Sequence, residues 1–308
     1  MTFLYKADGA RGLEWRALFA ELAPDIEFRL WPDVGRPEEI RYLAAWQAPP
    51  ELLAGLPGLE VLFSTGAGVD QFDLSRLPSQ VRLVRLIDPG IIAGMVEYVV
   101  FAALALHRDM PAYLAAQREG CWDALPLVPA ARRRIGVMGL GELGQAALAA
   151  LKPFGFQLAG WNRSDRTIEG VRGFTGAAEL PGFLAECDIL ICLLPLTEDT
   201  RGILRRETLA QLPRGAALVN AGRGGHLVEA DLLAALDSGG LSAAVLDVAG
   251  QEPPPAGHPF FSHPKILLTP HIAAATHPQT AARVVLANIR RHQANQPMKG
   301  LVRRDRGY

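Results

Sequence analysis

The stretch Ile135-Gly-Val-Met-Gly-Leu-Gly-Glu-Leu-Gly144 decides the fold, because a short apolar run leads directly into a G-x-G-x-x-G turn. The helix-like run Gln145–Leu151 follows at once. In a strand–turn–helix unit the glycines permit a tight turn and close approach of the backbone to a pyrophosphate, and the helix N-terminus faces the phosphates. The motif alone is weak evidence, but this context predicts a dinucleotide site. The residues assigned to it are Gly139, Gly141, Glu142 and Leu143.

Short apolar runs alternate with helical patterns from about residue 134 to residue 272. The runs lack apolar–polar alternation, as expected for parallel strands buried on both faces. The succession predicts an α/β fold with a doubly wound parallel sheet. The predicted strands are Ile135–Met138, Gln157–Trp161, Ile189–Leu193, Ala216–Asn220, Ala243–Leu246 and Ile266–Thr269. The predicted helices are Leu143–Leu151, Leu180–Glu186, Arg206–Gln211 and Glu229–Ser238.

The N-terminal part repeats this alternation more loosely and without a phosphate turn, which predicts a second, smaller Rossmann-like domain. We expect residues 1–97 with 276–308 to form a substrate-binding domain and residues 98–275 a dinucleotide-binding domain, with the active-site cleft between them. Helices at about Ala93–His107 and Pro278–Gln293 would cross between the domains. The Pro-rich segment Pro111–Arg134 is interpreted as an irregular surface loop, with a subunit-contact arm as the alternative. The strands predicted for the first domain are Thr2–Lys6, Ile26–Leu30, Tyr42–Ala45, Val61–Ser64 and Val81–Arg85.

Composition excludes several classes of protein. The chain has 308 residues and a formal net charge of -1, which argues against a dedicated nucleic-acid or membrane-surface binder. The longest apolar stretch, Ile91–Leu106, is interrupted by Glu97 and falls short of the about 20 residues of a membrane span, so a buried helix is expected. No secretory signal is recognisable, and a cytoplasmic location is expected. Cys187 and Cys192 lie at an odd spacing in a strand-like run, which predicts opposite faces and no disulfide.

The residues after the second strand of the dinucleotide unit indicate which cofactor is used. An acidic residue about 20 positions beyond the turn grips the ribose 2′-hydroxyl of NAD. Asn162 stands in that place and removes the repulsion toward a 2′-phosphate. Arg163 and Arg166 offer planar donors for phosphate oxygens, and Ser164 a neutral donor. We therefore predict NADPH as the preferred cofactor; NAD stays possible, since Asp165 could restore part of its affinity, and ordinary solvated charges are the alternative interpretation.

Three polar residues follow predicted strands and point to catalysis. Arg223 and His271 each come directly after a strand, where the loops of an open α/β sheet build the ligand crevice. An arginine binds a carboxylate through two parallel N–H bonds and polarises an adjacent keto oxygen. Glu252, in a proline-stiffened loop, is a plausible partner for His271, because a carboxylate on one ring nitrogen fixes the tautomer and helps the ring hold a proton near neutral pH. A lone histidine or loop glutamate is more often structural, but together the three predict hydride transfer to a carboxylate-bearing substrate.

Several motifs in order resemble the D-2-hydroxyacid dehydrogenase family, and within it the glyoxylate/hydroxypyruvate reductase A type. The resemblance covers nearly the whole chain. The matching segments are Gly66-Ala-Gly-Val-Asp70, Gly139-x-Gly-x-x-Gly144, Leu193-Leu-Pro-Leu-Thr197, Asn220-Ala-Gly-Arg-Gly224, Glu252-Pro253, Thr269-Pro-His-Ile272 and Arg306-Gly-Tyr308.

The resemblance implies NADPH-dependent reduction of small 2-oxoacids, glyoxylate to glycolate and hydroxypyruvate to glycerate. Arg223 would bind the substrate, His271 would be the proton donor, and Glu252 would orient it. The family pattern also implies a homodimer, with contacts through the nucleotide domain and the Pro111–Arg134 segment. The remaining implied cofactor contacts are Leu194, Pro195 and Ala221, which would line the nicotinamide, and Asp247, near its carboxamide.

Two substrate contacts are implied in the first domain. Backbone N–H groups of Ala67 and Gly68 would hold the far carboxylate oxygen, although a simple tight turn is the interpretation without the resemblance. Trp46 would restrict the pocket to small acids, with a core aromatic as an equal alternative. Met95 is a weaker candidate for the same wall.

Other functions remain open at this point. Reduction of bulkier 2-oxoacids depends on pocket walls that the sequence does not position. A dinucleotide-sensing protein on the same scaffold is disfavoured by the intact set of Arg223, Glu252 and His271. Formate oxidation is disfavoured by Asn162 and Arg163. No metal site is predicted, because prolines separate the nearby histidines and no acidic cluster joins them.

Overall fold

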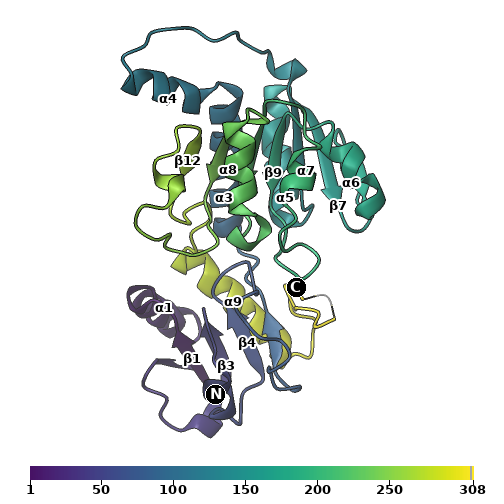
Figure 1. Ribbon diagram of the computed structural model, residues 1–308. Helices are drawn as coiled ribbons and strands as arrows, with labels where there is room; N and C mark the ends of the chain where they lie inside the picture. The colour runs from purple at the N-terminus through teal and green to yellow at the C-terminus, as the bar shows by residue number, and fades with distance from the viewer. Residues whose placement is uncertain (306) are drawn as a thin grey trace. The chain divides into compact units, whose positions relative to one another are not determined.

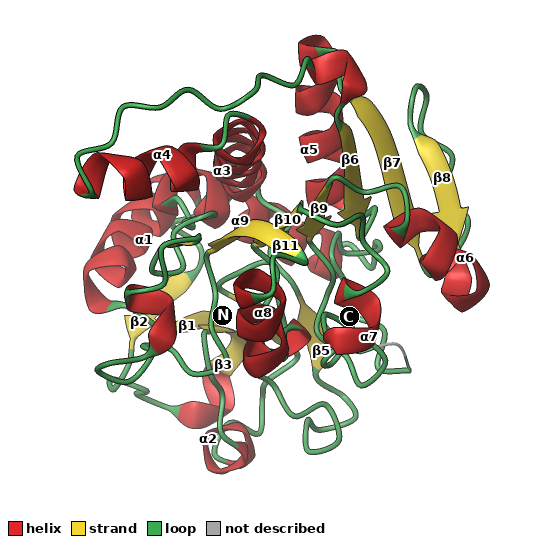
Figure 2. Ribbon diagram, turned by 45° about the horizontal axis from the view of Figure 1, so that its top comes forward, coloured by secondary structure: helices red, strands yellow, loops and turns green. Residues whose placement is uncertain are grey.

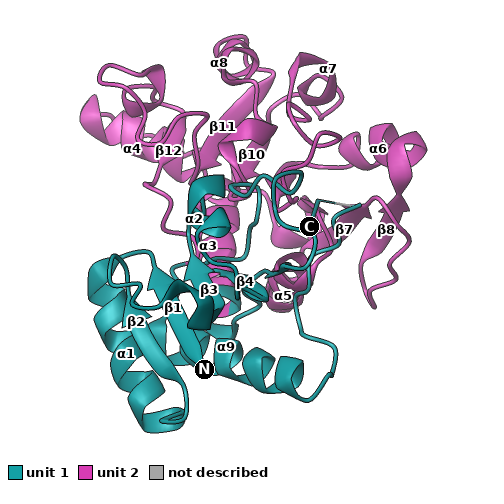
Figure 3. Cartoon of the chain, turned by 90° about the horizontal axis from the view of Figure 1, so that it is seen from below, with its two compact units in different colours: residues 1–92, 275–308 teal, residues 93–274 magenta. Residues whose placement is uncertain are grey.

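The computed structural model describes residues 1–305 and 307–308. The chain forms two compact units, drawn in separate colours in Figure 3. Unit 1 comprises Met1–Ile92 and Ala275–Tyr308, and unit 2 comprises Ala93–Ala274. Each unit is built around its own parallel sheet. The Arg306 position of the tail motif lies outside the described residues.

Unit 2 contains a seven-stranded sheet in the order β12-β11-β10-β9-β6-β7-β8, and its strands pair in parallel throughout. The strand order reverses between β6 and β9, and the carboxyl ends of the strands at such a reversal are where open α/β sheets bind their ligands. Figure 2 shows these strands in yellow and the helices of the chain in red. The strands are β6 (Arg134–Met138), β7 (Gln157–Asn162), β8 (Arg172–Thr175), β9 (Ile189–Cys192), β10 (Ala216–Asn220), β11 (Leu241–Leu246) and β12 (Ile266–Leu268).

Helices cover both faces of this sheet (Figure 1). On one face α3 (Pro89–His107) and α5 (Glu142–Leu151) bury apolar side chains against β6, β9 and β10. The other face is covered by α6 (Gly176–Leu184), α7 (Arg206–Leu209) and α8 (Glu229–Asp237). α3 is long and apolar enough to cross a membrane by length and composition alone. Its residues Val99, Ala102 and Ala103 are fully buried in the core of unit 2, as expected for a core helix.

Unit 1 contains a five-stranded parallel sheet in the order β2-β1-β3-β4-β5. On one face α1 and α9 pack together, and Phe3, Trp15 and Phe19 form an aromatic cluster under α1. The elements are β1 (Thr2–Lys6), α1 (Gly9–Leu22), β2 (Glu27–Leu30), β3 (Ile40–Ala45), α2 (Pro50–Ala54), β4 (Val61–Ser64), β5 (Arg82–Val84) and α9 (Pro278–Gln293).

The predicted fold class is confirmed: both units are α/β with parallel sheets. One local prediction is wrong. The segment Pro111–Arg134 was expected to be irregular, but it begins inside a helix, α4 (Met110–Arg118). Pro111 sits in the first turn of α4, where its missing N–H costs no hydrogen bond and its fixed φ suits a helix. The irregular part starts only after Arg118 and carries Trp122, which is 100% exposed.

Candidate active site

The glycine-rich turn of unit 2 has the geometry of a dinucleotide cradle. Gly139 has φ 100°, and a Cβ on it would lie 2.8 Å from the Leu193 carbonyl oxygen. A Cβ on Gly144 would collide with the Gly139 carbonyl, so α5 packs against the turn only because residue 144 is glycine. Gly141, by contrast, faces open space at the N-terminus of α5. The first N–H groups of α5 therefore face a space that a pyrophosphate can approach, and the residues present fit such a group.

Asn162 closes the other side of this turn at the end of β7. Its Oδ1 accepts a bond of 3.4 Å from the Leu140 N–H, and its Nδ2 donates to the Ser164 carbonyl oxygen at 2.9 Å. Arg163 and Arg166 are exposed, and Arg163 pairs with Asp199 at 3.4 Å. The end of β7 thus carries an amide, a hydroxyl and two guanidinium groups, which suits a phosphorylated ribose better than a bare one.

Hydrogen bonds from a buried asparagine side chain hold the loop that follows β10. Asn220 is fully buried; its Oδ1 accepts from the Gly222 N–H at 3.2 Å, and its Nδ2 donates to the Arg223 carbonyl oxygen at 3.1 Å. The Arg223 N–H donates to His226 Nδ1 at 3.1 Å. These bonds determine where the Arg223 side chain leaves the carboxyl edge of the sheet.

The loop after β11 packs directly on this arginine loop. A Cβ on Gly224 would overlap the carbonyl of Ala249, and it would lie 2.6 Å from the Gly250 nitrogen. The glycine at position 224, next to Arg223, therefore permits close packing of the two loops. Asp247 N–H also bonds the Asn220 carbonyl oxygen at 3.0 Å, so the two loops leave the sheet in register.

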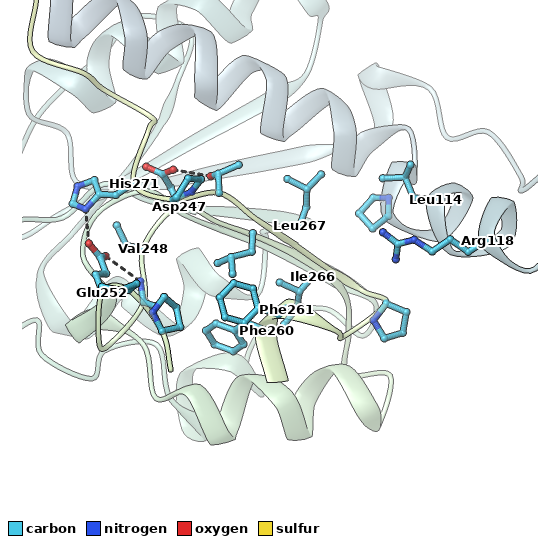
Figure 4. Close-up of a pocket in the computed structure, with 18 residues that line it drawn as sticks. Leu114, Arg118, Asp247, Val248, Glu252, Phe260, Phe261, Ile266, Leu267 and His271 are labelled. Atoms are coloured by element: carbon cyan, nitrogen blue, oxygen red, sulfur yellow. Dashed lines mark hydrogen bonds and ion pairs between the residues drawn. The ribbon is translucent and has the colours of Figure 1, made fainter. Parts of the chain in front are cut away.

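His271 and Glu252 form the contact expected from the sequence. His271 Nδ1 lies 2.7 Å from Glu252 Oε2, and Glu252 Oε1 accepts from the Ala249 N–H at 3.1 Å (Figure 4). Each side chain is 37% exposed. Because the carboxylate engages Nδ1, the imidazole can exchange a proton with a ligand through Nε2. This is the geometry of a general acid or base whose orientation is set by a carboxylate.

Asp247 holds the turn that carries His271. His271 has φ 54°, a left-handed conformation that is unusual for a residue with a Cβ. Asp247 Oδ1 accepts from the Ile272 N–H and Oδ2 from the Ala273 N–H, both at 2.8 Å, and the His271 N–H donates to the Asp247 carbonyl oxygen at 2.9 Å. Sequence reasoning assigned Asp247 to the cofactor. The structure shows in addition that its carboxylate fixes the backbone on either side of the histidine.

Two residues of this network were not expected from the sequence. Thr269 Oγ1 donates to Asp247 Oδ1 at 2.6 Å and lies 2.6 Å from the Tyr98 hydroxyl of α3. Burial raises the pKa of Tyr98 to about 12, so this phenol stays neutral and able to donate. For Thr269 the sequence offered two signals, its position at the end of a strand and its place in the matching segment Thr269-Pro-His-Ile272, and neither assigned it a role.

A pocket of about 660 Å³ lies beside the histidine–glutamate pair within unit 2. Figure 4 places His271 and Glu252 at one end and Leu114 and Arg118 of α4 at the other. Proline, leucine, isoleucine and phenylalanine side chains dominate its walls. These apolar walls lower the local dielectric and strengthen the hydrogen bond between His271 and Glu252.

The candidate substrate residues of unit 1 follow adjacent strands. Trp46 comes after β3 and is 42% exposed, so the alternative of a core aromatic is wrong. A Cβ on Gly66 would lie 3.2 Å from the Trp46 ring, which brings the loop after β4 against this tryptophan. Ser64 Oγ accepts from the Gly66 N–H and donates to the Gly68 carbonyl oxygen, shaping the loop that contains Ala67. Met95, the weaker candidate, lies in the core of unit 2.

Comparison with known proteins identifies the family. The family model described as D-isomer specific 2-hydroxyacid dehydrogenase, NAD binding domain, matches residues 100–273. The chain belongs to this family. Among curated dehydrogenases, the glyoxylate/hydroxypyruvate reductase A of Yersinia enterocolitica is 40% identical over 96% of each chain, and that of Serratia proteamaculans is 40% identical over 94% of each chain.

Solved structures of the dehydrogenase family superpose over the whole chain. A D-isomer specific 2-hydroxyacid dehydrogenase from Xanthobacter autotrophicus, in complex with NADPH and MES, has a TM-score of 0.94 at 39% identity and covers 100% of this chain and 99% of its own. An NADPH-dependent glyoxylate/hydroxypyruvate reductase from Sinorhizobium meliloti, in complex with NADP and sulfate, has a TM-score of 0.92 at 37% identity with the same coverage.

Proposed function

We propose that this dehydrogenase reduces small 2-oxoacids with NADPH, converting glyoxylate to glycolate and hydroxypyruvate to glycerate. The observation that carries the proposal is the 2.7 Å contact between His271 Nδ1 and Glu252, on the sheet edge that also bears Arg223. The names of the curated relatives and the NADP-bound neighbours support the same substrate class and cofactor.

The residues of unit 2 provide a place for NADPH, which when bound supplies the hydride for the reaction. Gly139 and Gly141 give the pyrophosphate access to the N–H groups of Glu142 and Leu143. Asn162, Ser164 and the two arginines would hold the 2′-phosphate. The residues that would line the nicotinamide are Leu194, Pro195, Ala221 and Asp247, all in loops that leave the carboxyl edge of the sheet after β9, β10 and β11.

Arg223 and His271 would have different roles toward the substrate: Arg223 would bind it, and His271 would donate the proton. The Arg223 guanidinium would bind the substrate carboxylate and polarise the neighbouring carbonyl. As the carbonyl carbon accepts hydride, its oxygen gains negative charge and takes the proton from His271 Nε2, which yields a 2-hydroxyacid. Glu252 balances the charge of the protonated ring before the transfer and keeps Nε2 aimed at the oxygen.

Unit 1 would supply the remaining substrate contacts. We propose that the N–H groups of Ala67 and Gly68 bind the second carboxylate oxygen and that the Trp46 ring limits the length of the acid. Residues 1–97 with 276–308 would then act as the substrate-binding domain and residues 98–275 as the dinucleotide-binding domain.

The direct test is a panel of 2-oxoacids assayed with NADPH and with NADH. Glyoxylate and hydroxypyruvate with NADPH should give the highest kcat/KM, ahead of pyruvate and phenylpyruvate. A higher value for phenylpyruvate would replace the proposed substrate class by bulkier 2-oxoacids. Binding of NADPH without turnover of any 2-oxoacid would indicate a dinucleotide sensor and overturn the enzymatic proposal.

We further propose a homodimer in the cytoplasm. The segment after α4 exposes Trp122 fully and Leu127 to 71%, an apolar surface that suits a contact with a second copy. Cys121, Cys187 and Cys192 are all unpaired, which fits a reducing compartment.

A further inference from the structure

We propose that Glu229 and His258 are positioning residues that hold the Glu252 loop against the Arg223 loop. The inference rests on the proposed function, because it concerns the alignment of the same proton donor and guanidinium. Neither residue was singled out from the sequence for this reaction, and neither is among the residues that would touch substrate or cofactor.

Glu229 joins two distant points of the loop that follows β11. It lies in the first turn of α8, where Glu229 Oε1 accepts from the Gly250 N–H at 2.8 Å. Its second oxygen, Oε2, lies 3.2 Å from His258 Nε2. One carboxylate therefore binds the loop both before and after Glu252.

His258 is set up to donate to Glu229. Its Nδ1 accepts from the Phe260 N–H at 3.3 Å, which leaves the hydrogen on Nε2 in the neutral ring. The His258 side chain is 15% exposed, and its ring packs edge-on against the buried ring of Phe260 at 4.6 Å. The far end of the loop is thus fixed to the core of unit 2.

The hydrogen bond between Glu229 and Gly250 lies only two residues before Glu252, which contacts His271. Ala249, which precedes Gly250, donates its N–H to Glu252 Oε1, and Glu252 Oε2 contacts His271. The same Ala249–Gly250 peptide is packed on Gly224, next to Arg223. Glu229 therefore sets the position of Glu252 relative to both His271 and Arg223. Without this tie the peptide can move away from Gly224, and Glu252 moves with it.

Loss of the hydrogen bonds made by Glu229 should lower kcat strongly but should change the affinity for NADPH little. For Glu229→Ala we expect kcat for glyoxylate to fall about 10- to 100-fold, because displacement of a catalytic group by about 1 Å has effects of this size. The Kd for NADPH, measured by fluorescence titration, should stay within about twofold, since Glu229 lies outside the glycine-rich turn.

Three further variants separate positioning from a general loss of stability. Glu229→Asp keeps the negative charge at the helix N-terminus but is one methylene too short to reach both partners, so kcat should fall while the melting temperature stays near that of the wild type. His258→Ala should lower kcat in the same direction. Glu207→Ala is the matched control: it also removes a first-turn carboxylate, in α7, that is 70% exposed and pairs only locally with Arg205, and its kcat should not change.

The decisive measurement is a double-mutant cycle with Glu252→Gln. If Glu229 acts through Glu252, Glu229→Ala should change kcat less than about twofold in the Glu252→Gln background. Full additivity of the two changes, or a wild-type kcat in Glu229→Ala and Glu229→Asp, would overturn the inference. Failure of the proposed function would be seen separately, as absence of 2-oxoacid reduction by the wild-type protein.

Discussion

At the scale of single residues, the position of His271 depends on a backbone conformation that is unfavourable by itself. His271 has φ 54°, in the left-handed region. For a residue with a Cβ this conformation is less favourable by about 1–2 kcal/mol than the right-handed one. The two N–H groups bonded to the Asp247 carboxylate offset this cost and keep the imidazole on the Glu252 side. The position of His271 thus depends on its backbone hydrogen bonds as well as on the contact between its ring and Glu252.

We propose that Asn162 sets the preference for NADPH over NADH. In Asn162→Asp a carboxylate would repel the 2′-phosphate of NADPH and accept a hydrogen bond from the 2′-hydroxyl of NADH. We expect the ratio of kcat/KM with NADPH to that with NADH to fall at least about 10-fold. The control Asn162→Ala removes the amide without adding charge and should shift this ratio less. An unchanged ratio in Asn162→Asp would show that residue 162 does not discriminate between the cofactors.

Arg223 should contribute to binding and to catalysis together. For Arg223→Ala we expect kcat/KM for glyoxylate to fall about 10³-fold, as for loss of a group that stabilises developing oxyanion charge. Arg223→Lys should recover only part of this, because an ammonium cannot bind a carboxylate through two parallel bonds. The steady-state rate of NADPH oxidation measures both; near-normal turnover of Arg223→Ala would contradict its role.

The sequence located the three catalytic candidates because each follows a recognisable strand, and parallel strands end at one edge of a sheet. It could not show what holds them. Tyr98 and Thr269 are 171 positions apart, and no local pattern connects a core helix to the turn before His271. The sequence likewise assigned no role to Glu229, because its partners Gly250 and His258 meet it only in the folded chain.

At the scale of elements, an ion pair between Arg134 and Asp188 links the starts of two neighbouring central strands, β6 and β9. Asp188 accepts from the Arg134 backbone N–H at 2.8 Å and from its guanidinium at 2.7 and 3.2 Å. Burial raises the pKa of the Asp188 carboxyl, but the hydrogen bonds and charge of Arg134 outweigh it and hold the pKa below its ordinary value of 3.8.

This tie should stabilise the protein in a pH-dependent way. Because the pKa is lower in the folded state, the stabilisation is present above the unfolded value near 4 and is lost as pH falls through the folded value. At pH 7 we expect Asp188→Asn to lower the free energy of unfolding by about 1–2 kcal/mol. Urea unfolding of both proteins at pH 7 and below pH 4 measures the difference, which should shrink at the lower pH. A difference that is independent of pH would contradict the assignment.

Elements with a clear apolar pattern, continuous in the buried strands and periodic in α9, were predicted well, and several elements without such a pattern were missed. β1, β4, β10 and α9 have the expected limits. β8 was not expected, because this edge strand exposes Arg172 and Gly173 and has no buried run. The prediction that Cys187 and Cys192 form no disulfide is confirmed, but its reason is wrong: Cys187 precedes β9, and both thiols lie in the same core cluster.

At the scale of the whole molecule, the two units have distinct cores and the parallel sheets expected from the alternating pattern. Residues 276–308 were expected from the sequence to fold with residues 1–97, and the compact units divide at Ile92 and Ala275. The sequence also distinguished the unit that has a phosphate turn from the unit that lacks one, but the residues at which the units divide depend on packing between segments far apart in the chain.

The proposed homodimer predicts a simple result in solution. Light scattering should give twice the chain mass of 33.2 kDa. Replacing Trp122 and Leu127 together by serine should shift the mass toward that of one chain at micromolar concentration, because these exposed side chains would be buried against the second copy. The single-chain mass for the wild type would refute the dimer.

The central claim is that His271, held by Glu252, donates the proton to a 2-oxoacid bound by Arg223. The most direct test is kcat for NADPH-dependent glyoxylate reduction by His271→Ala, with the Kd for NADPH measured on the same preparation. We predict that kcat falls about 10³-fold or more while the Kd stays within about twofold. A kcat within a few-fold of the wild-type value would contradict the account.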